Sequence, residues 1–176
     1  MKQRIIIASV LALFAVHGVA DAGELSAGVF NSFKGFGLSL DYAPSTDILN
    51  SFMVYTDTYR VFSGTYRDAG IKMVYLHYNR LKSFESDSAS FDILLGPGAS
   101  TGYVRDAGSE LFGFMLSADV AIALRARFQR NIDLEFGTVA ELGFISGDNG
   151  GRFQMSMYDN GLTQALLPFL KIMVRF

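Results

Sequence analysis

The residues best suited to chemistry in this 176-residue sequence are a lone histidine and a set of charged side chains. Of the two histidines, only His77 lies outside the N-terminal segment, in the stretch YLHYNR. A serine nucleophile activated by a histidine must lie within hydrogen-bond reach of it. The residue two positions after His77 is Asn79, and no serine adjoins the histidine. We therefore expect a packed or interfacial histidine, no catalytic residue, and a protein that is not an enzyme.

The charged side chains of the second half of the chain alternate with apolar ones. Such charges can line a pore, or they can form ion pairs that fill the interior of the protein. Which of the two applies depends on the secondary-structure elements that carry them. The charges concerned are Asp119, Arg125, Arg127, Asp133, Glu135, Glu141, Lys171 and Arg175.

Composition excludes several kinds of site. The absence of cysteine excludes a disulfide scaffold, a thiol nucleophile and a cysteine-ligated metal. The formal net charge of -2 gives no basic footprint for nucleic acid. The Asp-Asn-Gly sequences at 148–150 and 159–161 lack the spaced oxygen ligands of a calcium loop and favour tight turns. We expect no metal and no cofactor.

The N-terminus has the pattern of a secretory signal. Lys2 and Arg4 precede an uncharged run from Ile5 to Val16, and small residues surround Ala20-Asp21-Ala22. Twelve helical residues reach only about 18 Å, which is too short to cross a bilayer. We expect cleavage near Ala22, with residues 1–22 as signal peptide and 23–176 as one mature domain.

The rest of the chain alternates between apolar and polar residues with a period of two, which is typical of β-strands. The pattern is clearest from Leu111 to Phe128 and, after a short turn, from Ile132 to Phe144, which predicts a hairpin. Six weaker copies bring the number of predicted strands to eight: Glu24–Asn31, Phe36–Ala43, Asn50–Arg60, Gly70–Arg80, Ala89–Arg105 and Ala165–Phe176.

An even number of strands places both termini at the same end of a closed sheet. The turns 44–49, 81–88 and 129–131 then share that end, and the longest loop, Ser146–Gln164, lies at the other. Alternation fits both a soluble barrel with an apolar interior and a membrane barrel with an apolar outside. The polar faces of the clear hairpin mix glycine, serine and alanine with charges, as a crowded interior would. We therefore predict an all-β, eight-stranded, antiparallel, up-and-down transmembrane β-barrel.

The last strand carries a family resemblance. The chain ends ALLPFLKIMVRF, with Leu170, Ile172, Val174 and the terminal Phe176 on one face. This resembles the C-terminal signature that the barrel-assembly machinery reads in bacterial outer-membrane barrels. The mature chain resembles a small outer-membrane barrel of the OmpA/OmpX type, which implies location in the outer membrane, contact with its lipid and assembly by that machinery. Several tyrosines near predicted strand ends are candidates for the interfacial aromatic girdles: Tyr42, Tyr55, Tyr59, Tyr75, Tyr78 and Tyr103.

The resemblance leaves several functions open. Eight strands enclose an interior that side chains just fill, so the interior charges favour a structural plug over a channel. A transport alternative uses a lateral opening at Gly96, Pro97, Gly98 and Gly102, because Pro97 lacks a ladder donor. The other interpretation of these residues is a bulge or bend. A lipid-modifying enzyme is less favoured, since lipid A deacylases of this kind need a serine where Asn79 stands, and a soluble periplasmic carrier is the fourth alternative.

The long loop offers a surface for a partner. Exposed aromatic and methionine side chains bind proteins or ligands, although the alternation in this loop equally predicts an extension of the neighbouring strands. The candidate contact residues are Arg152, Phe153, Met155, Met157 and Tyr158. The leading hypothesis is a non-enzymatic outer-membrane barrel whose loops serve adhesion, partner binding or envelope integrity.

Overall fold

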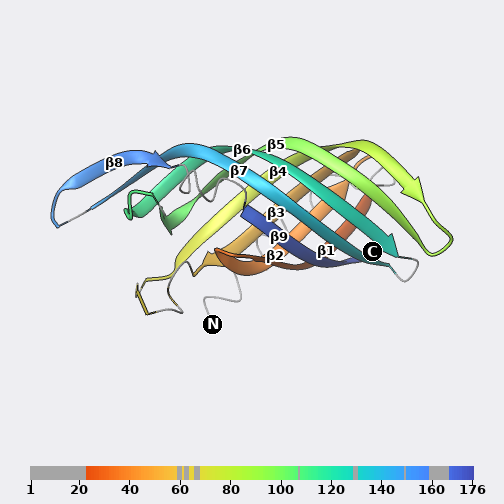
Figure 1. Ribbon diagram of the computed structural model, residues 1–176, viewed down its shortest axis with the longest axis horizontal. Coiled ribbons are helices and arrows are strands. Elements are labelled where there is room, and N and C mark those ends of the chain that lie inside the picture. The colour runs from red at the N-terminus through yellow and green to blue at the C-terminus, as the bar shows by residue number, and fades with distance from the viewer. Residues whose placement is uncertain are drawn as a thin grey trace.

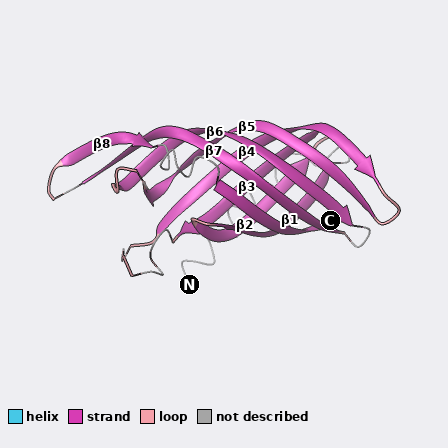
Figure 2. Ribbon diagram, viewed as in Figure 1, coloured by secondary structure: helices cyan, strands magenta, loops and turns pink. Residues whose placement is uncertain are grey.

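The computed structural model describes residues 23–58, 61, 64–65, 68–106, 108–128, 131–148, 150–158 and 167–176. The signal segment, Tyr59 and the second Asp-Asn-Gly sequence lie outside these residues. The described chain consists of strands and the turns between them (Figure 2). The strands are β1 Glu24–Ser32, β2 Gly35–Ala43, β3 Ile48–Asp57, β4 Gly70–Glu85, β5 Ala89–Arg105, β6 Phe112–Phe128, β7 Ile132–Asp148, β8 Phe153–Tyr158 and β9 Leu167–Arg175.

Eight of these strands close into a barrel (Figure 1). Consecutive strands from β1 to β7 pair antiparallel, β9 pairs with β7, and β9 also pairs with β1 to complete the ring. The predicted fold, an eight-stranded up-and-down antiparallel barrel, is confirmed. Among the described residues, no helix is long and apolar enough to cross a membrane.

The pairing register fixes the slope of the strands. Cross-strand partners can be followed once around the barrel, starting from Phe144 of β7 and its partner Leu116 of β6. The path passes through β5, β4, β3, β2, β1 and β9 and returns to β7 at Leu134. The ring therefore closes with an offset of ten residues. For eight strands this offset requires a tilt of roughly 40° from the barrel axis, so each residue rises only about 2.4 Å along that axis.

Two hairpins extend beyond the rest of the barrel, one at each end (Figure 1). At the end that holds Arg175, β4 continues to Glu85 through what we expected to be a turn at 81–88, after a register shift between Arg80 and Lys82. At the opposite end, β7 continues to Asp148, and β8 returns along it inside the expected long loop. Among the described strands, β8 pairs with β7 alone.

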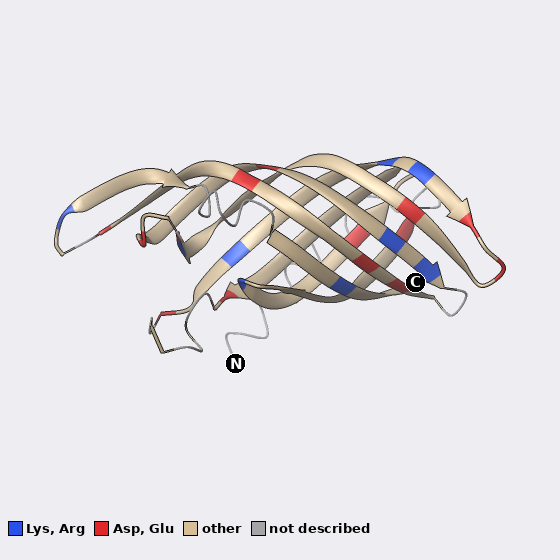
Figure 3. Ribbon diagram, in the orientation of Figure 1, with Lys and Arg blue, Asp and Glu red and all other residues tan. Residues whose placement is uncertain are grey.

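The two faces of the barrel wall differ in chemistry. Along β6 and β7 the outward side chains are apolar and exposed, for example Leu116, Phe136 and Phe144. The inward side chains of the same strands include Arg125, Asp133 and Glu135, each at most 1% exposed. Figure 3 shows that charged residues lie on strands throughout the barrel. The outside of the wall is therefore apolar, and its inside carries charged side chains together with apolar ones.

Candidate functional site

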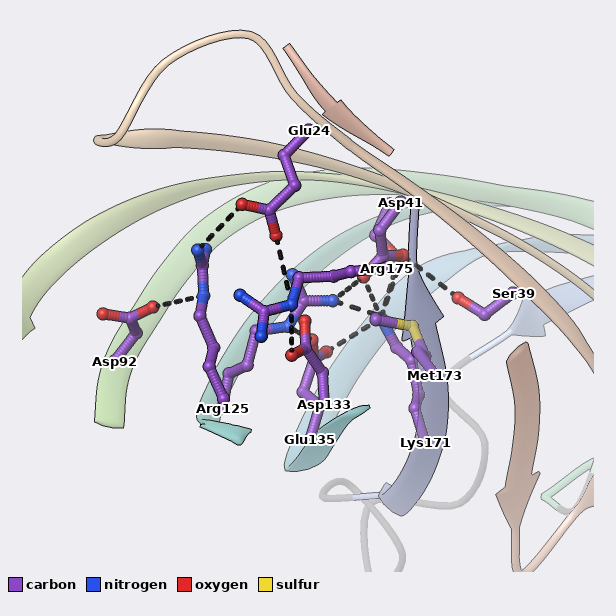
Figure 4. Close-up of polar contacts among 12 residues, drawn as sticks. Glu24, Ser39, Asp41, Asp92, Arg125, Asp133, Glu135, Lys171, Met173 and Arg175 are labelled. Carbon is purple, nitrogen blue, oxygen red and sulfur yellow. Dashed lines mark hydrogen bonds and ion pairs between the residues drawn. The ribbon is translucent and has the colours of Figure 1, made fainter. Parts of the chain in front are cut away.

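Four buried charges meet inside the barrel toward the end that carries the C-terminus, and we call them the terminus-side cluster: Asp41, Arg125, Glu135 and Lys171. Arg125 pairs with Asp41 through one nitrogen and with Glu135 through Nε, at 3.1 Å. Lys171 Nζ lies 2.8 Å from Glu135 Oε1 and 3.5 Å from Asp41 Oδ1. The cluster thus joins β2, β6, β7 and β9 across the interior (Figure 4).

Hydroxyl groups complete this cluster. Ser39 Oγ donates to Asp41 at 3.1 Å, and Lys171 Nζ donates to Ser51 Oγ at 2.8 Å. Two acids and two bases balance in charge, and each is at most 1% exposed. A buried carboxylate is tolerated when it is paired and hydrogen-bonded; Asp41 is both, and Glu135 is paired with two cations.

A chain of ion pairs lies next to this cluster, nearer the mouth of the barrel, and we call it the rim. Arg127 Nε lies 3.0 Å from Asp92 Oδ2, and Arg175 Nε lies 3.2 Å from Asp133 Oδ1. Both arginines also reach Glu24, at 3.4 and 3.6 Å (Figure 4). The side chains of Arg127, Arg175 and Glu24 are partly exposed, so water screens these pairs.

A second buried group lies toward the opposite mouth, and we call it the loop-side cluster: Lys34, Asp57, Lys72, Glu141 and Tyr158. Lys72 pairs with Glu141, and Lys34 Nζ lies 3.7 Å from Asp57 Oδ2. Both lysines donate to Tyr158 Oη at 3.2 Å, and that hydroxyl donates to Glu141 Oε2 at 3.3 Å. Tyr158 belongs to β8, so this cluster fastens the projecting hairpin to the barrel mouth.

Burial dominates the titration of the two members of this cluster that lie outside the barrel strands. Desolvation lowers the pKa of Lys34, in the turn between β1 and β2, although the nearby Asp57 opposes that change. Desolvation, together with the charge of Glu141, raises the pKa of the Tyr158 hydroxyl well above its usual value. Tyr158 therefore stays a neutral hydrogen-bonding group over the physiological range.

An apolar layer separates the two clusters. On β7, Val139 lies between Glu135 and Glu141, and on β4, Val74 and Leu76 follow Lys72 toward the other end. Phe30 fills the centre, with its ring centroid 5.0 Å from that of Tyr55 and 5.8 Å from that of Phe169. One cavity that borders this layer measures about 10 Å³, which is room for about one water molecule.

The eight charges singled out in the sequence are distributed over these groups. Arg125, Glu135 and Lys171 belong to the terminus-side cluster, and Arg127, Asp133 and Arg175 to the rim. Glu141 is in the loop-side cluster. Asp119 is buried nearby, where it accepts hydrogen bonds from Ser100 and Ser117.

Arg80 also belongs to the interior network, because its Nε lies 3.2 Å from Asp92 Oδ1. Sequence reasoning did not assign eight residues to this network: Glu24, Lys34, Asp41, Asp57, Lys72, Arg80, Asp92 and Tyr158. For Asp41 the signal was present, because an outward face of Phe36, Leu38, Leu40 and Tyr42 requires Asp41 to point inward. Lys72 could have been found by the same alternation along β4. Lys34 lies in a turn, where alternation gives no direction.

Three tyrosines are corrections to the sequence interpretation. Tyr158, expected on a contact surface with Arg152, Phe153, Met155 and Met157, is fully buried, because its hydroxyl bridges the loop-side cluster. The other four are exposed. Tyr55 and Tyr78 were candidates for the aromatic girdles, yet both point inward and are buried, whereas Tyr42, Tyr75 and Tyr103 point outward.

His77 lies on the outward face of β4. Its Nδ1 lies 2.8 Å from Asn50 Oδ1, and the hydroxyl of Tyr75 donates to the same oxygen at 2.8 Å. Ser51, the neighbour of Asn50, is buried inside the barrel and points away from His77. Among the described residues, no three histidine, aspartate or glutamate side chains are grouped to hold a metal ion.

The β4–β5 ladder is interrupted at Pro97 but keeps its register: no pairs join His77 and Tyr78 to Pro97 and Gly96. Leu76 faces Gly98 and Asn79 faces Leu95, so the register is the same on both sides of the proline. A Cβ at Gly96 would collide with the carbonyl oxygen of His77, which shows how closely the strands approach. The strands therefore stay in close contact at Gly96, Gly98 and Gly102, and the lateral opening at Gly96, Pro97, Gly98 and Gly102 stays a prediction. The bulge lies elsewhere, between Arg80 and Lys82.

The residues of the C-terminal signature form one outward stripe. Leu170, Ile172, Val174 and Phe176 are all exposed, and the Phe176 amide donates to Leu25 O at 2.9 Å. The terminal residue thus extends the seam between β9 and β1.

Comparison with known proteins adds little to this description. No protein-family model matches the sequence, and no curated protein matches it. A major outer membrane protein from Thermus thermophilus is similar in structure, with a TM-score of 0.46 and 14% sequence identity, over 89% of this chain and 100% of that one. At that level the similarity does not bear on function.

Proposed function

We propose that this chain is a non-enzymatic integral outer-membrane barrel with a sealed interior. The observation that carries the proposal is the arrangement of the wall: apolar side chains cover its outside, whereas two balanced ion clusters and an apolar layer fill its inside. Exposing an apolar outer face to water costs about 25 cal/mol per Å², whereas the same face is stable in lipid.

The sealed interior argues against transport through the barrel. A pathway for ions or small molecules would have to cross the layer of Phe30, Val139 and Phe169, which are all buried. The unchanged register of β4 and β5 on both sides of Pro97 likewise argues against a lateral exit. Function is then left to the outer wall and to the projecting hairpins, which would serve adhesion, partner binding or envelope integrity.

Two steps of biogenesis belong to the same proposal. The N-terminal segment would direct export and be removed near Ala22, and the stripe ending at Phe176 would be read by the barrel-assembly machinery. The exposed alternation of Leu170, Ile172, Val174 and Phe176 supports the second step.

Fractionation of cells that express the full chain tests the proposal. The protein should be recovered with the outer membrane, and its gel mobility should change on boiling, because a closed barrel stays compact in detergent until heated. Mass measurement of the purified protein should show loss of residues 1–22. Recovery in the soluble fraction with no boiling-dependent shift would contradict the proposal.

A further inference from the structure

The hairpin formed by the end of β7 and by β8 has an unusual outer surface. On β8 the outward side chains are Phe153, Met155 and Met157, which are 77%, 63% and 55% exposed. The six residues of β8, FQMSMY, carry no charge. A strand end that faces water normally carries charged side chains on its exposed face.

The opposite face of this hairpin is covered at its base. Ile145 of β7 and Tyr158 of β8 are fully buried, and they pack with Val104, Leu111 and Met115 into a second apolar cluster. On β8 the outward side chains are therefore apolar and uncovered within the described structure, whereas the inward side chains beyond Tyr158 are the polar Ser156 and Gln154.

The outer face continues the wall of the barrel without a break. Met157 faces Phe144, and Phe144 faces Leu116 of β6. These side chains belong to the same outward parity as Leu134 and Phe136 lower on β7. The medium that contacts the outer wall of the barrel therefore also contacts the hairpin, beginning at Met157.

The height of the hairpin places it at the edge of a bilayer. At about 2.4 Å per residue, the outward stripe of β7 from Ile132 to Phe144 spans about 30 Å, slightly more than the roughly 25 Å apolar band of such barrels. Phe153 faces Asp148, four residues beyond Phe144 and so about 10 Å higher. Headgroups extend the bilayer by roughly 5 to 8 Å on each side.

We propose that the outer face of the β7–β8 hairpin is a lipid-binding surface that anchors the hairpin in the outer leaflet. Met157 lies at the boundary between acyl chains and headgroups, Met155 lies within the headgroup layer, and Phe153 lies at its outer edge. Methionine suits this position because its flexible, polarisable side chain adapts to irregular apolar surroundings. The tip carries two exposed charges: Arg152, which attracts the phosphates of the headgroups, and Asp148, which faces Phe153 and opposes that attraction. The inference rests on the proposed membrane location.

The absence of tryptophan from the sequence allows a clean test. Single variants Met157→Trp, Met155→Trp and Phe153→Trp would be refolded as full-length mature protein into phosphatidylcholine vesicles, with or without bromine high on the acyl chains. Bromine quenches tryptophan fluorescence at short range. We expect strong quenching for Met157→Trp, less for Met155→Trp and least for Phe153→Trp.

Two further variants separate the possible outcomes. Gln154→Trp lies on the same strand with the opposite parity and should be quenched less than Met155→Trp, its neighbour. Phe136→Trp, in the middle of the wall, should be quenched by bromine deep in the acyl chains, and loss of that signal would overturn the membrane location itself. Each variant would first be checked for the boiling-dependent mobility shift.

The inference would be overturned if Phe136→Trp were quenched while the three hairpin variants were not and remained open to a water-soluble quencher. It would also be overturned if the hairpin probes were shielded from both quenchers and cross-linked to a second copy, since a protein would then cover the surface.

Discussion

The two buried ion clusters of this barrel are built from different parts of the chain. The terminus-side cluster takes all four charges from barrel strands, whereas the loop-side cluster includes Lys34 from a turn and Tyr158 from the projecting β8. The first therefore joins wall to wall across the interior, and the second joins the wall to a hairpin that stands outside it. Loss of the first should weaken the whole barrel, and loss of the second should release mainly the hairpin.

The largest effect is expected from removing the shared cation of the terminus-side cluster. Arg125→Met leaves Asp41 and Glu135 with Lys171 as their remaining partner, and breaking a buried pair in this way costs about 3 to 5 kcal/mol. The free energy of unfolding can be measured by urea titration of the protein in vesicles, with the loss of the compact gel band as the readout.

Lys72→Met is the matched variant in the loop-side cluster. It should cost less, because Lys34 stays close to Glu141 and Tyr158 still donates to that carboxylate. An equal loss from both variants would remove the distinction between the clusters.

The apolar layer between the clusters gives the next effect. Phe169→Ala should cost about 3 kcal/mol, because truncating a buried ring leaves a cavity against Phe30. Leu170→Ala, its outward neighbour, should cost clearly less, since lipid fills the space. The same unfolding measurement compares the two, and similar losses would show that the layer is not tightly packed.

A smaller effect is expected at the hairpin. Tyr158→Phe keeps the ring but removes the hydroxyl shared by Lys34, Lys72 and Glu141, at a cost of about 1 kcal/mol. Trypsin should then cleave faster after the exposed Arg152, while the compact gel band of the barrel is unchanged. Met157→Leu, one residue away on the outer face, is the control and should leave the cleavage rate as it is.

The smallest effect is expected at the rim. Glu24→Gln removes one carboxylate from Arg127 and Arg175, which keep Asp92 and Asp133. Partly exposed pairs are worth less than about 1 kcal/mol and are screened by salt. Unfolding at low ionic strength should show a small loss of stability, and this loss should disappear at high ionic strength. A loss of stability as large as that of Arg125→Met would contradict the screening of the rim by water.

The sequence predicted the parts of this architecture that depend on alternation. A strand with one buried face shows a period of two, so the strands, their order and the inward direction of Arg125 and Glu135 could be inferred. Contacts between distant strands could not, because they depend on the ten-residue offset of the ring, which no local pattern shows. Asp41 meets Arg125 and Lys171 only in the closed barrel. The strand extension that the alternation equally predicted is present as β8, and Tyr158 was misplaced because it was grouped with Phe153, Met155 and Met157 although it has the opposite parity.

The most direct test of the sealed membrane barrel is electrical. Purified protein, refolded and shown to be compact by its mobility before boiling, would be added to a planar lipid bilayer under voltage. We expect no unitary conductance steps from the wild-type protein, because the layer of Phe30, Val139 and Phe169 blocks the interior. Reproducible steps of constant size would contradict the account and would identify the interior charges as the lining of a pathway.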